Sequence, residues 1–170
     1  ISTLSLHDAL PIWKIAAALN RQHPRDLFDY NYIEKDNIDW VKRGFIFALL
    51  GSDKPFLESL SPNIIDQQDA LENQFRGMTD IPFTYENYKN AREQLITSIN
   101  SILSDEDKSF LVSFEDANPH WDKSVYSDFR HFPSVQWKLL NINNLKTLNP
   151  AKHLHEVNRL KTFFGMNIQN

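Results

Sequence analysis

Along most of the chain, hydrophobic residues recur three and four positions apart, which is the spacing of one face of an α-helix. This pattern predicts helices over residues 13–22, 24–34, 38–51, 63–76, 84–103, 104–114, 134–142 and 150–164. The alternating pattern of a half-buried strand is nearly absent. We therefore expect a mainly α-helical fold in which the hydrophobic faces form the core.

Residues that favour helix ends mark several of these boundaries. Pro24 fits the first turn of a helix, Asn37 is a suitable cap for the next one, and Gly51 is typical of a helix end. Ser104 followed three positions later by Asp107 has the spacing of a capping box. These residues predict where helices begin and end independently of the hydrophobic spacing.

Composition and charge narrow the class of protein. The chain has 170 residues, of which 41% are hydrophobic, and a formal net charge of −4. It lacks the overall basic charge of a nucleic-acid binder, although a local basic patch is compatible with these numbers. The absence of Cys excludes disulfides and thiolate metal sites and is typical of a reducing compartment. No hydrophobic run approaches the roughly 20 residues of a membrane helix, so we expect no membrane association.

Residues 3–12, "TLSLHDALPI", form an unusual N-terminal stretch. One reading frame of a common short-read sequencing adapter translates to these letters, and we interpret residues 1–12 as an adapter artefact. The alternative is a genuine amphipathic segment leading into the first helix. We exclude the stretch from the prediction of the fold.

Five charged residues in the next stretch, "WKIAAALNRQHPRDLFDY", have the spacing of a binding site. On a helix, Lys14 and Arg21 share one face, and Ala18 between them permits close approach. The following helix carries Arg25 and, three positions apart on one side, the carboxylates of Asp26 and Asp29. Cations beside two carboxylates suit a polyphosphate accompanied by a divalent metal.

The same residues also have an ordinary structural interpretation. Asp26 lies where an acidic side chain stabilises the beginning of a helix. Arg25 and Asp29 are four apart and could form a surface pair worth about 0.3–0.5 kcal/mol. Lys14 could be a solvated helix charge, and spacing alone leaves both interpretations open.

The sequence "KIAAALNR" followed by "PRDLFD" resembles a motif of the AbiEii-type nucleotidyltransferase toxins of type IV toxin–antitoxin and phage abortive-infection systems. Two further segments, "ENQFRGMT" at 72–79 and "FPSVQWKLLNI" at 132–142, are similar to the C-terminal half of longer members. The resemblance implies transfer of a nucleotide from a nucleoside triphosphate, with Mg²⁺, to an acceptor that we expect to be RNA. It also implies a cognate antitoxin and a cytoplasmic location.

The resemblance assigns roles to the five charged residues. Lys14 matches the active-site lysine expected to bind the triphosphate. Asp29 matches its acidic partner, which would position or deprotonate the acceptor hydroxyl. Asp26 matches a second catalytic position and would also hold Arg25 or the helix start, while Arg21 and Arg25 are expected phosphate contacts.

The chain departs from this family in one respect. The enzyme class requires a Gly-Gly-Ser/Thr turn followed by Asp-x-Asp on a strand, where alternate residues share a face. Gly51-Ser52 ends a predicted helix, and 105–107 (Asp-Glu-Asp) begins one, so neither fits. We therefore assign no metal ligand here and expect the N-terminal α/β catalytic part to be largely missing. Residues 13–36 would end the active-site region, 37–170 would form a helical C-terminal domain, and the chain alone would be inactive.

Two other interpretations remain open at this point. The chain could be a free-standing helical module that binds a partner through the aromatic segment 121–132, or an inactive fragment. Other candidate sites are weaker: His153 and His155 lie two apart on a predicted helix, do not converge on a metal, and are expected to be solvated or capping. Trp137 beside Lys138 could contact RNA, but we expect Trp137 to pack in the core.

Overall fold

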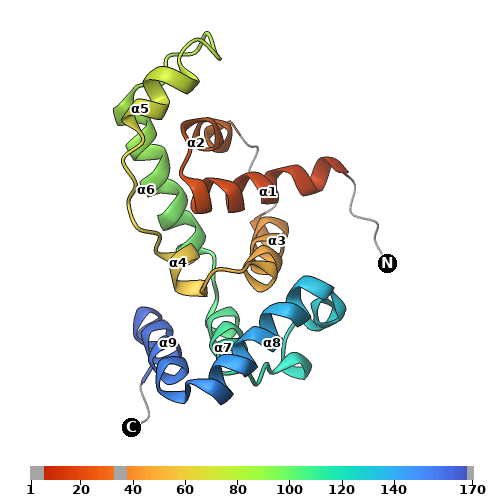
Figure 1. Ribbon diagram of the computed structural model, residues 1–170. Coiled ribbons are helices and arrows are strands. Elements are labelled where there is room, and N and C mark those ends of the chain that lie inside the picture. Colours follow the sequence, from red (N-terminus) through yellow and green to blue (C-terminus); the bar gives the residue numbers. More distant parts are fainter. Residues whose placement is uncertain (1–5, 33–37, 168–170) are drawn as a thin grey trace. The chain divides into compact units, whose positions relative to one another are not determined.

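The computed structural model describes residues 6–32 and 38–167. All of the secondary structure in these residues is helical (Figure 1). In chain order these are α1 (Leu6–Arg21), α2 (Pro24–Asn31), α3 (Ile38–Gly51), α4 (Phe56–Leu60), α5 (Gln68–Ala70), a π-helix (Leu71–Phe75), α6 (Tyr85–Ser101), α7 (Asp105–Glu115), two 3₁₀ turns (Trp121–Lys123 and Ser127–His131), α8 (Pro133–Leu148) and α9 (Pro150–Phe163). No strand is present among the described residues. The expectation of a mainly α fold is confirmed.

The chain divides into two compact units. The first consists of Ile1–Ala48 and Ser59–Ile102, and the second of Leu49–Glu58 and Leu103–Asn170. The boundary expected between residues 36 and 37, and the cap expected at Asn37, lie outside the described residues. Of the stretch assigned to the adapter, residues 6–12 continue the backbone of α1 and residues 1–5 are not described.

In the first unit, α1, α2 and α6 pack against one another (Figure 1). Their buried side chains recur at helical spacing and include Ile15, Ala18, Leu19, Leu27, Tyr30, Tyr88, Ala91, Leu95 and Ile99. The stripe predicted along 84–103 is thus the core face of α6. Because these side chains leave water together, their burial is the main force that holds the three helices.

Two capping boxes fix the starts of α6 and α7. The Thr84 hydroxyl accepts from the Asn87 backbone N–H at 3.2 Å, and the Asn87 side chain accepts from the Thr84 N–H at 2.9 Å. The box predicted at Ser104 is confirmed, because Ser104 Oγ accepts from Asp107 N–H at 3.3 Å and Asp107 Oδ2 accepts from Ser104 N–H at 2.9 Å. Each box satisfies two backbone donors that the first helical turn leaves unpaired.

In the second unit, α7, α8 and α9 pack together around aliphatic and aromatic side chains. The buried set includes Leu49, Leu50, Phe56, Phe110, Leu111, Phe114, Tyr126, Val135, Ile142, Val157 and Leu160. Buried hydroxyl groups of Tyr126 and Ser113 hydrogen-bond within the unit, to Asp107 Oδ1 at 2.5 Å and to the Phe110 carbonyl at 2.7 Å. These two hydroxyl groups therefore keep hydrogen-bond partners when they are taken out of water.

The prediction of one helix over 63–76 is wrong. Residues 63–67 have no helical structure, and only α5 and the five-residue π-helix follow. The reason is tertiary: side chains from other parts of the first unit bind the backbone of 63–65, as described below. Gly77 follows the π-helix closely and has a φ of +84°, a conformation that glycine adopts without strain.

Within the described residues, no helix combines the length and the apolar character that crossing a membrane requires.

Candidate functional site

A two-residue turn between α1 and α2 positions the predicted charged residues. Gln22 has a φ of +50°, which reverses the chain direction directly after α1. His23 then caps α2, because its Nδ1 accepts from the Arg25 backbone N–H at 3.3 Å. Pro24 occupies the first helical turn, as predicted, where it loses no hydrogen bond. The result is a helical hairpin in which the α1 face of Lys14 and Arg21 lies against α2.

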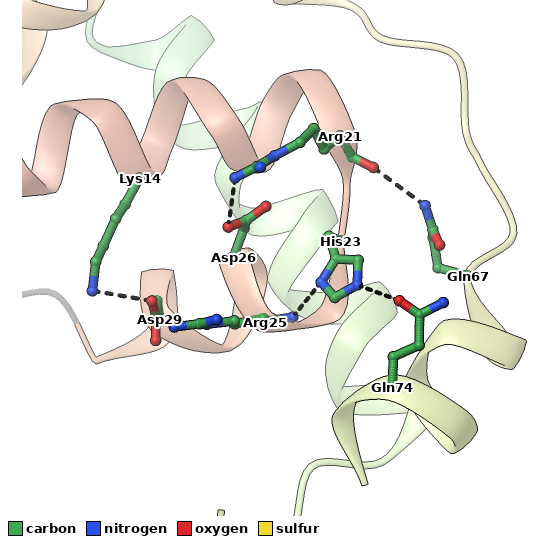
Figure 2. Close-up of polar contacts among 8 residues, drawn as sticks. All are labelled: Lys14, Arg21, His23, Arg25, Asp26, Asp29, Gln67 and Gln74. Carbon is green, nitrogen blue, oxygen red and sulfur yellow. Dashed lines mark hydrogen bonds and ion pairs between the residues drawn. The ribbon is translucent and has the colours of Figure 1, made fainter. Parts of the chain in front are cut away.

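Two nested ion pairs join the helices of this hairpin (Figure 2). Lys14 Nζ lies 3.0 Å from Asp29 Oδ2, and Arg21 Nη2 lies 3.1 Å from Asp26 Oδ1. The first pair joins residues fifteen apart in sequence and the second joins residues five apart, as an antiparallel hairpin requires. We call Lys14, Arg21, Arg25, Asp26 and Asp29 the α1–α2 charge cluster.

The ion pairs in the cluster differ from those that the spacing of its residues suggested. Asp29 pairs with Lys14, and no pair between Arg25 and Asp29 is found. Asp26 pairs with Arg21 rather than holding Arg25. Among the described residues, the exposed Arg25 guanidinium has no ion-pair or hydrogen-bond partner. Three cations and two carboxylates therefore share one region, and one of the cations is unengaged.

Exposure within the cluster is graded. The side chains of Lys14 and Asp29 are 42% and 31% exposed, whereas that of Asp26 is 14% exposed. Asp26 Oδ2 is buried and lacks a hydrogen-bond partner among the described residues. A carboxylate oxygen in that state is costly unless something donates to it. Ala18 is fully buried, so the close approach it permits is used by the protein's own helices.

A buried polar network holds the turn that carries the cluster. The Gln22 side chain donates to the Asn63 carbonyl at 2.6 Å and accepts from the Ile65 N–H at 3.2 Å. The Tyr88 hydroxyl donates to the Gln22 carbonyl at 2.8 Å, and Arg92 Nη1 donates to the Ile65 carbonyl at 2.8 Å. Burial raises the pKa of the Tyr88 hydroxyl above its ordinary value. These contacts fix 63–65 in a non-helical path and anchor the hairpin to α6.

Two further contacts join residues of the hairpin to the segment 67–74. His23 Nε2 lies 3.3 Å from Gln74 Oε1, and Gln67 Nε2 donates to the Arg21 carbonyl at 3.2 Å (Figure 2). The sequence analysis did not identify Gln22, His23 or Arg92. No local pattern marks them, because most of their partners lie 27 to 70 positions away along the chain; the exceptions are the helix cap and the bond from Arg92 to Tyr88.

The other sequence-based candidates have different surroundings from those expected. Trp137 is 64% exposed, so the prediction that it packs in the core is wrong. His153 is buried and its Nε2 lies 2.9 Å from the Glu115 carbonyl, so it is neither solvated nor a cap. In the segment 121–132, Trp121 and Tyr126 pack against Phe110, with centroid distances of 5.2 and 5.4 Å. Those two rings are therefore engaged within the second unit.

Comparisons with family models, with curated proteins and with solved structures find no match to this chain.

The arrangement of the cluster suits binding of an anion. Lys14 lies on α1 and Arg25 lies in the first turn of α2, whose N-terminal end is positive. Across the described part of the chain, no group of three or more His, Cys, Asp or Glu side chains is placed to hold a metal ion. The cluster thus brings cations of the kind that bind phosphate groups beside two carboxylates.

Proposed function

We propose that the α1–α2 charge cluster binds the triphosphate of a nucleoside triphosphate, and that the chain belongs to a nucleotidyltransferase that transfers a nucleotide to an RNA acceptor. The observation that supports this most is the pairing of Lys14 with Asp29 at 3.0 Å. The resemblance to AbiEii-type toxins assigns these two residues to one active site, and the hairpin places them together. In this proposal the protein acts in the cytoplasm against RNA, restrained by a cognate antitoxin.

The modest strength of the ion pairs favours this role. Partly exposed pairs of this kind contribute about 0–1 kcal/mol to stability, so exchanging Asp29 for a phosphate costs Lys14 little. Release of Lys14 would leave the Asp29 carboxylate available to orient or deprotonate an acceptor hydroxyl. The unengaged Arg25 guanidinium adds a second, bidentate phosphate contact. The cluster is therefore ready to exchange partners without loss of the fold.

Mg²⁺ is expected for this class of enzyme, but the residues of the cluster do not fit a resident Mg²⁺ site. Asp26 and Asp29 each have one oxygen in an ion pair, and no third ligand accompanies them in the described residues. The sequence contains no Gly-Gly pair, and its Asp-x-Asp triplet at 105–107 begins the helix α7 rather than lying on a strand. The proposal thus assigns to this chain the phosphate and acceptor contacts alone.

Binding of ATP to the chain, measured by titration calorimetry, tests the first part of the proposal. Lys14→Ala should weaken binding about tenfold or more, because a hydrogen bond to a charged group is worth about 1.5–3 kcal/mol. Lys89→Ala is the matched control, since Lys89 is 40% exposed and pairs with Glu86 in the same unit. Equal affinities of the Lys14→Ala and Lys89→Ala proteins would contradict the proposal.

Transfer of a labelled nucleotide to total RNA tests the second part. We expect no transfer by the 170-residue chain with Mg²⁺, and transfer by a protein that also supplies the turn and the Asp-x-Asp strand. In that protein Lys14→Ala or Asp29→Ala should abolish transfer and toxicity on expression. Efficient transfer by the 170-residue chain itself would overturn the division of the site between two segments.

A further inference from the structure

The second unit contains a groove of about 660 Å³, a volume within the range of small-molecule sites. It is lined by residues of the segment 51–58, by residues of α8 that include Trp137 and Asn141, and by Lys152, Glu156 and Arg159 of α9. Buried Glu115 and Lys138 also line it. All of these residues belong to the second unit, so the groove is independent of the α1–α2 charge cluster.

Glu115 is the unusual member of the lining. Its side chain belongs to a residue only 7% exposed, and its Oε2 is buried without a hydrogen-bond partner among the described residues. Burial raises the pKa of this carboxyl above its ordinary value. An unsatisfied buried carboxylate oxygen is destabilising, and it becomes favourable only when a donor reaches it. Because Glu115 lines the groove, a bound ligand that donates an N–H group to its carboxylate would relieve this cost.

The neighbouring cation does not satisfy Glu115. Lys138 Nζ donates to the carbonyls of Ser52 and Lys54, at 3.0 and 2.5 Å, and lies 4.3 Å from the centroid of the Phe56 ring. No ion pair joins Lys138 to Glu115 among the described residues. Lys138 is thus committed to the protein, and Glu115 Oε2 has no hydrogen-bond partner among the described residues.

Two other residues that line the groove can also contact a ligand. Trp137 is 64% exposed and lines the groove, which offers a flat surface for stacking. Arg159 is engaged with Glu156 at 3.2 Å, whereas the Lys152 ammonium has no partner in the described part of the chain. A ligand that contacts Trp137, Glu115 and Lys152 together has a flat ring, an edge with N–H donors and an anionic group.

The chemistry of the bases selects among such ligands. Guanine presents two adjacent N–H donors on its pairing edge, which match a carboxylate. Adenine and cytosine place a ring acceptor beside their amino group, and uracil flanks its N–H with two carbonyls, so each brings an oxygen or nitrogen lone pair towards Glu115. The lining has four cations and four carboxylates, so its charge does not select between a base and a cationic ligand such as a guanidinium.

We propose that this groove binds a guanine nucleotide, with the base stacked on Trp137, its N–H edge donating to Glu115 and its phosphate beside Lys152. The same chemistry is offered by free GMP and by a guanine in single-stranded RNA. The inference does not rest on the function proposed for the first unit.

Titration calorimetry of the 170-residue chain with guanosine tests the site, because guanosine has no phosphate and so does not report on the α1–α2 charge cluster. Guanosine should bind about tenfold more tightly than adenosine. Glu115→Gln should remove this preference, and Trp137→Ala should weaken both nucleosides about tenfold. Lys152→Ala should weaken GMP and leave guanosine unchanged. Glu106→Gln, on the exposed first turn of α7, and Leu140→Ala, exposed on α8 outside the lining, are the matched controls.

The two sources of guanine are separated by comparing GMP with the pentanucleotides UUGUU and UUAUU. Tighter binding of UUGUU than of GMP identifies single-stranded RNA as the ligand, and the reverse identifies the free nucleotide. Equal binding of guanosine and adenosine, unchanged guanosine affinity in a folded Glu115→Gln protein, or stronger binding of free arginine than of guanosine would each overturn the proposal. Thermal unfolding of each variant establishes that it is folded.

Discussion

Two sets of cations and carboxylates in this chain differ in their pairing and in their exposure to water. In the α1–α2 charge cluster, Lys14 and Asp29 meet at 3.0 Å and remain 42% and 31% exposed. On the groove of the second unit, Glu115 and Lys138 are each only 7% exposed and form no ion pair. The first set is paired and solvated, and the second is unpaired and buried.

Because of this difference, the two sets are expected to contribute differently to ligand binding and to the stability of the fold. Pairing or separating charges that water still reaches changes the free energy little. The cluster can therefore exchange Asp29 for phosphate without unfolding. Charges removed from water depend on their fixed neighbours, and removal of one neighbour leaves the other uncompensated. We therefore expect equivalent substitutions in the two sets to have very different effects on the free energy of unfolding.

The largest effect is expected for Lys138→Met, which keeps the aliphatic stem and removes the ammonium. It leaves the carbonyls of Ser52 and Lys54 without this donor and Glu115 without a nearby positive charge. We expect a loss of about 3 kcal/mol in the free energy of unfolding, measured by urea denaturation. The control is Lys146→Met on the same helix, where the ammonium donates to the Asp116 carbonyl at 2.6 Å but is 45% exposed. Equal losses in the two variants would contradict the contrast.

A second substitution asks what holds the hairpin of the first unit. Gln22→Ala removes the bonds to the Asn63 carbonyl and the Ile65 N–H and should cost about 2 kcal/mol. Gln67→Ala, which removes one solvent-exposed bond to the Arg21 carbonyl, should cost less than about 0.5 kcal/mol in the same urea assay. A smaller loss for Gln22→Ala than for Gln67→Ala would show that the turn does not depend on the buried network.

Glu115→Gln removes both a buried carboxyl and the negative charge beside Lys138, so its clearest effect is expected in the pH dependence of stability. Because burial raises the pKa of Glu115, the folded chain holds more protons than the unfolded chain above pH 4.5, and stability falls as the pH rises from there. The variant should lack this fall. Urea denaturation across this pH range measures the difference, and an equal fall in the wild-type and variant proteins would contradict the raised pKa of Glu115.

Lys138 gives the matching test at high pH. Burial lowers the pKa of Lys138 from 10.5 to about 8, so between those values the unfolded chain binds more protons than the folded chain. Stability should therefore rise as the pH increases from about 8 to about 10.5, and Lys138→Met should remove this rise. Urea midpoints of the wild-type and variant proteins across this window measure it, and parallel curves would contradict the assignment.

Local sequence signals were sufficient for most of the fold. The Ser104 capping box, Pro24 at a helix start and Gly51 at a helix end all act through neighbours within one turn, and all three are confirmed. The prediction failed at 63–76, where the Gln22 side chain takes up backbone groups more than forty positions away. It failed again at Trp137, because α8 has hydrophobic residues on both of its sides and Val135, Lys138 and Ile142 occupy the buried one.

The candidate site was predictable only in part. Helical spacing placed Lys14 and Arg21 on one face, and the structure brings that face against Asp26 and Asp29. The partner of each charge depended on the hairpin, which the sequence does not specify locally. The groove was not predictable, since the burial of Glu115 results from packing of α7, α8 and α9 rather than from any motif.

The smallest effect is expected within the α1–α2 charge cluster itself. In a double-mutant cycle of Lys14→Ala and Asp29→Ala, each single change should cost less than about 1 kcal/mol, with a coupling energy of about 0.3–0.5 kcal/mol. The coupling should shrink further at 1 M salt, where the Debye length falls to about 3 Å. A corresponding cycle of Lys138→Met and Glu115→Gln should give a coupling several times larger and nearly independent of salt, because water does not screen it. If the exposed pair were coupled as strongly as the buried one, Lys14 would be held too firmly by Asp29 to exchange for a phosphate, and the proposed nucleotide site would lose its physical basis.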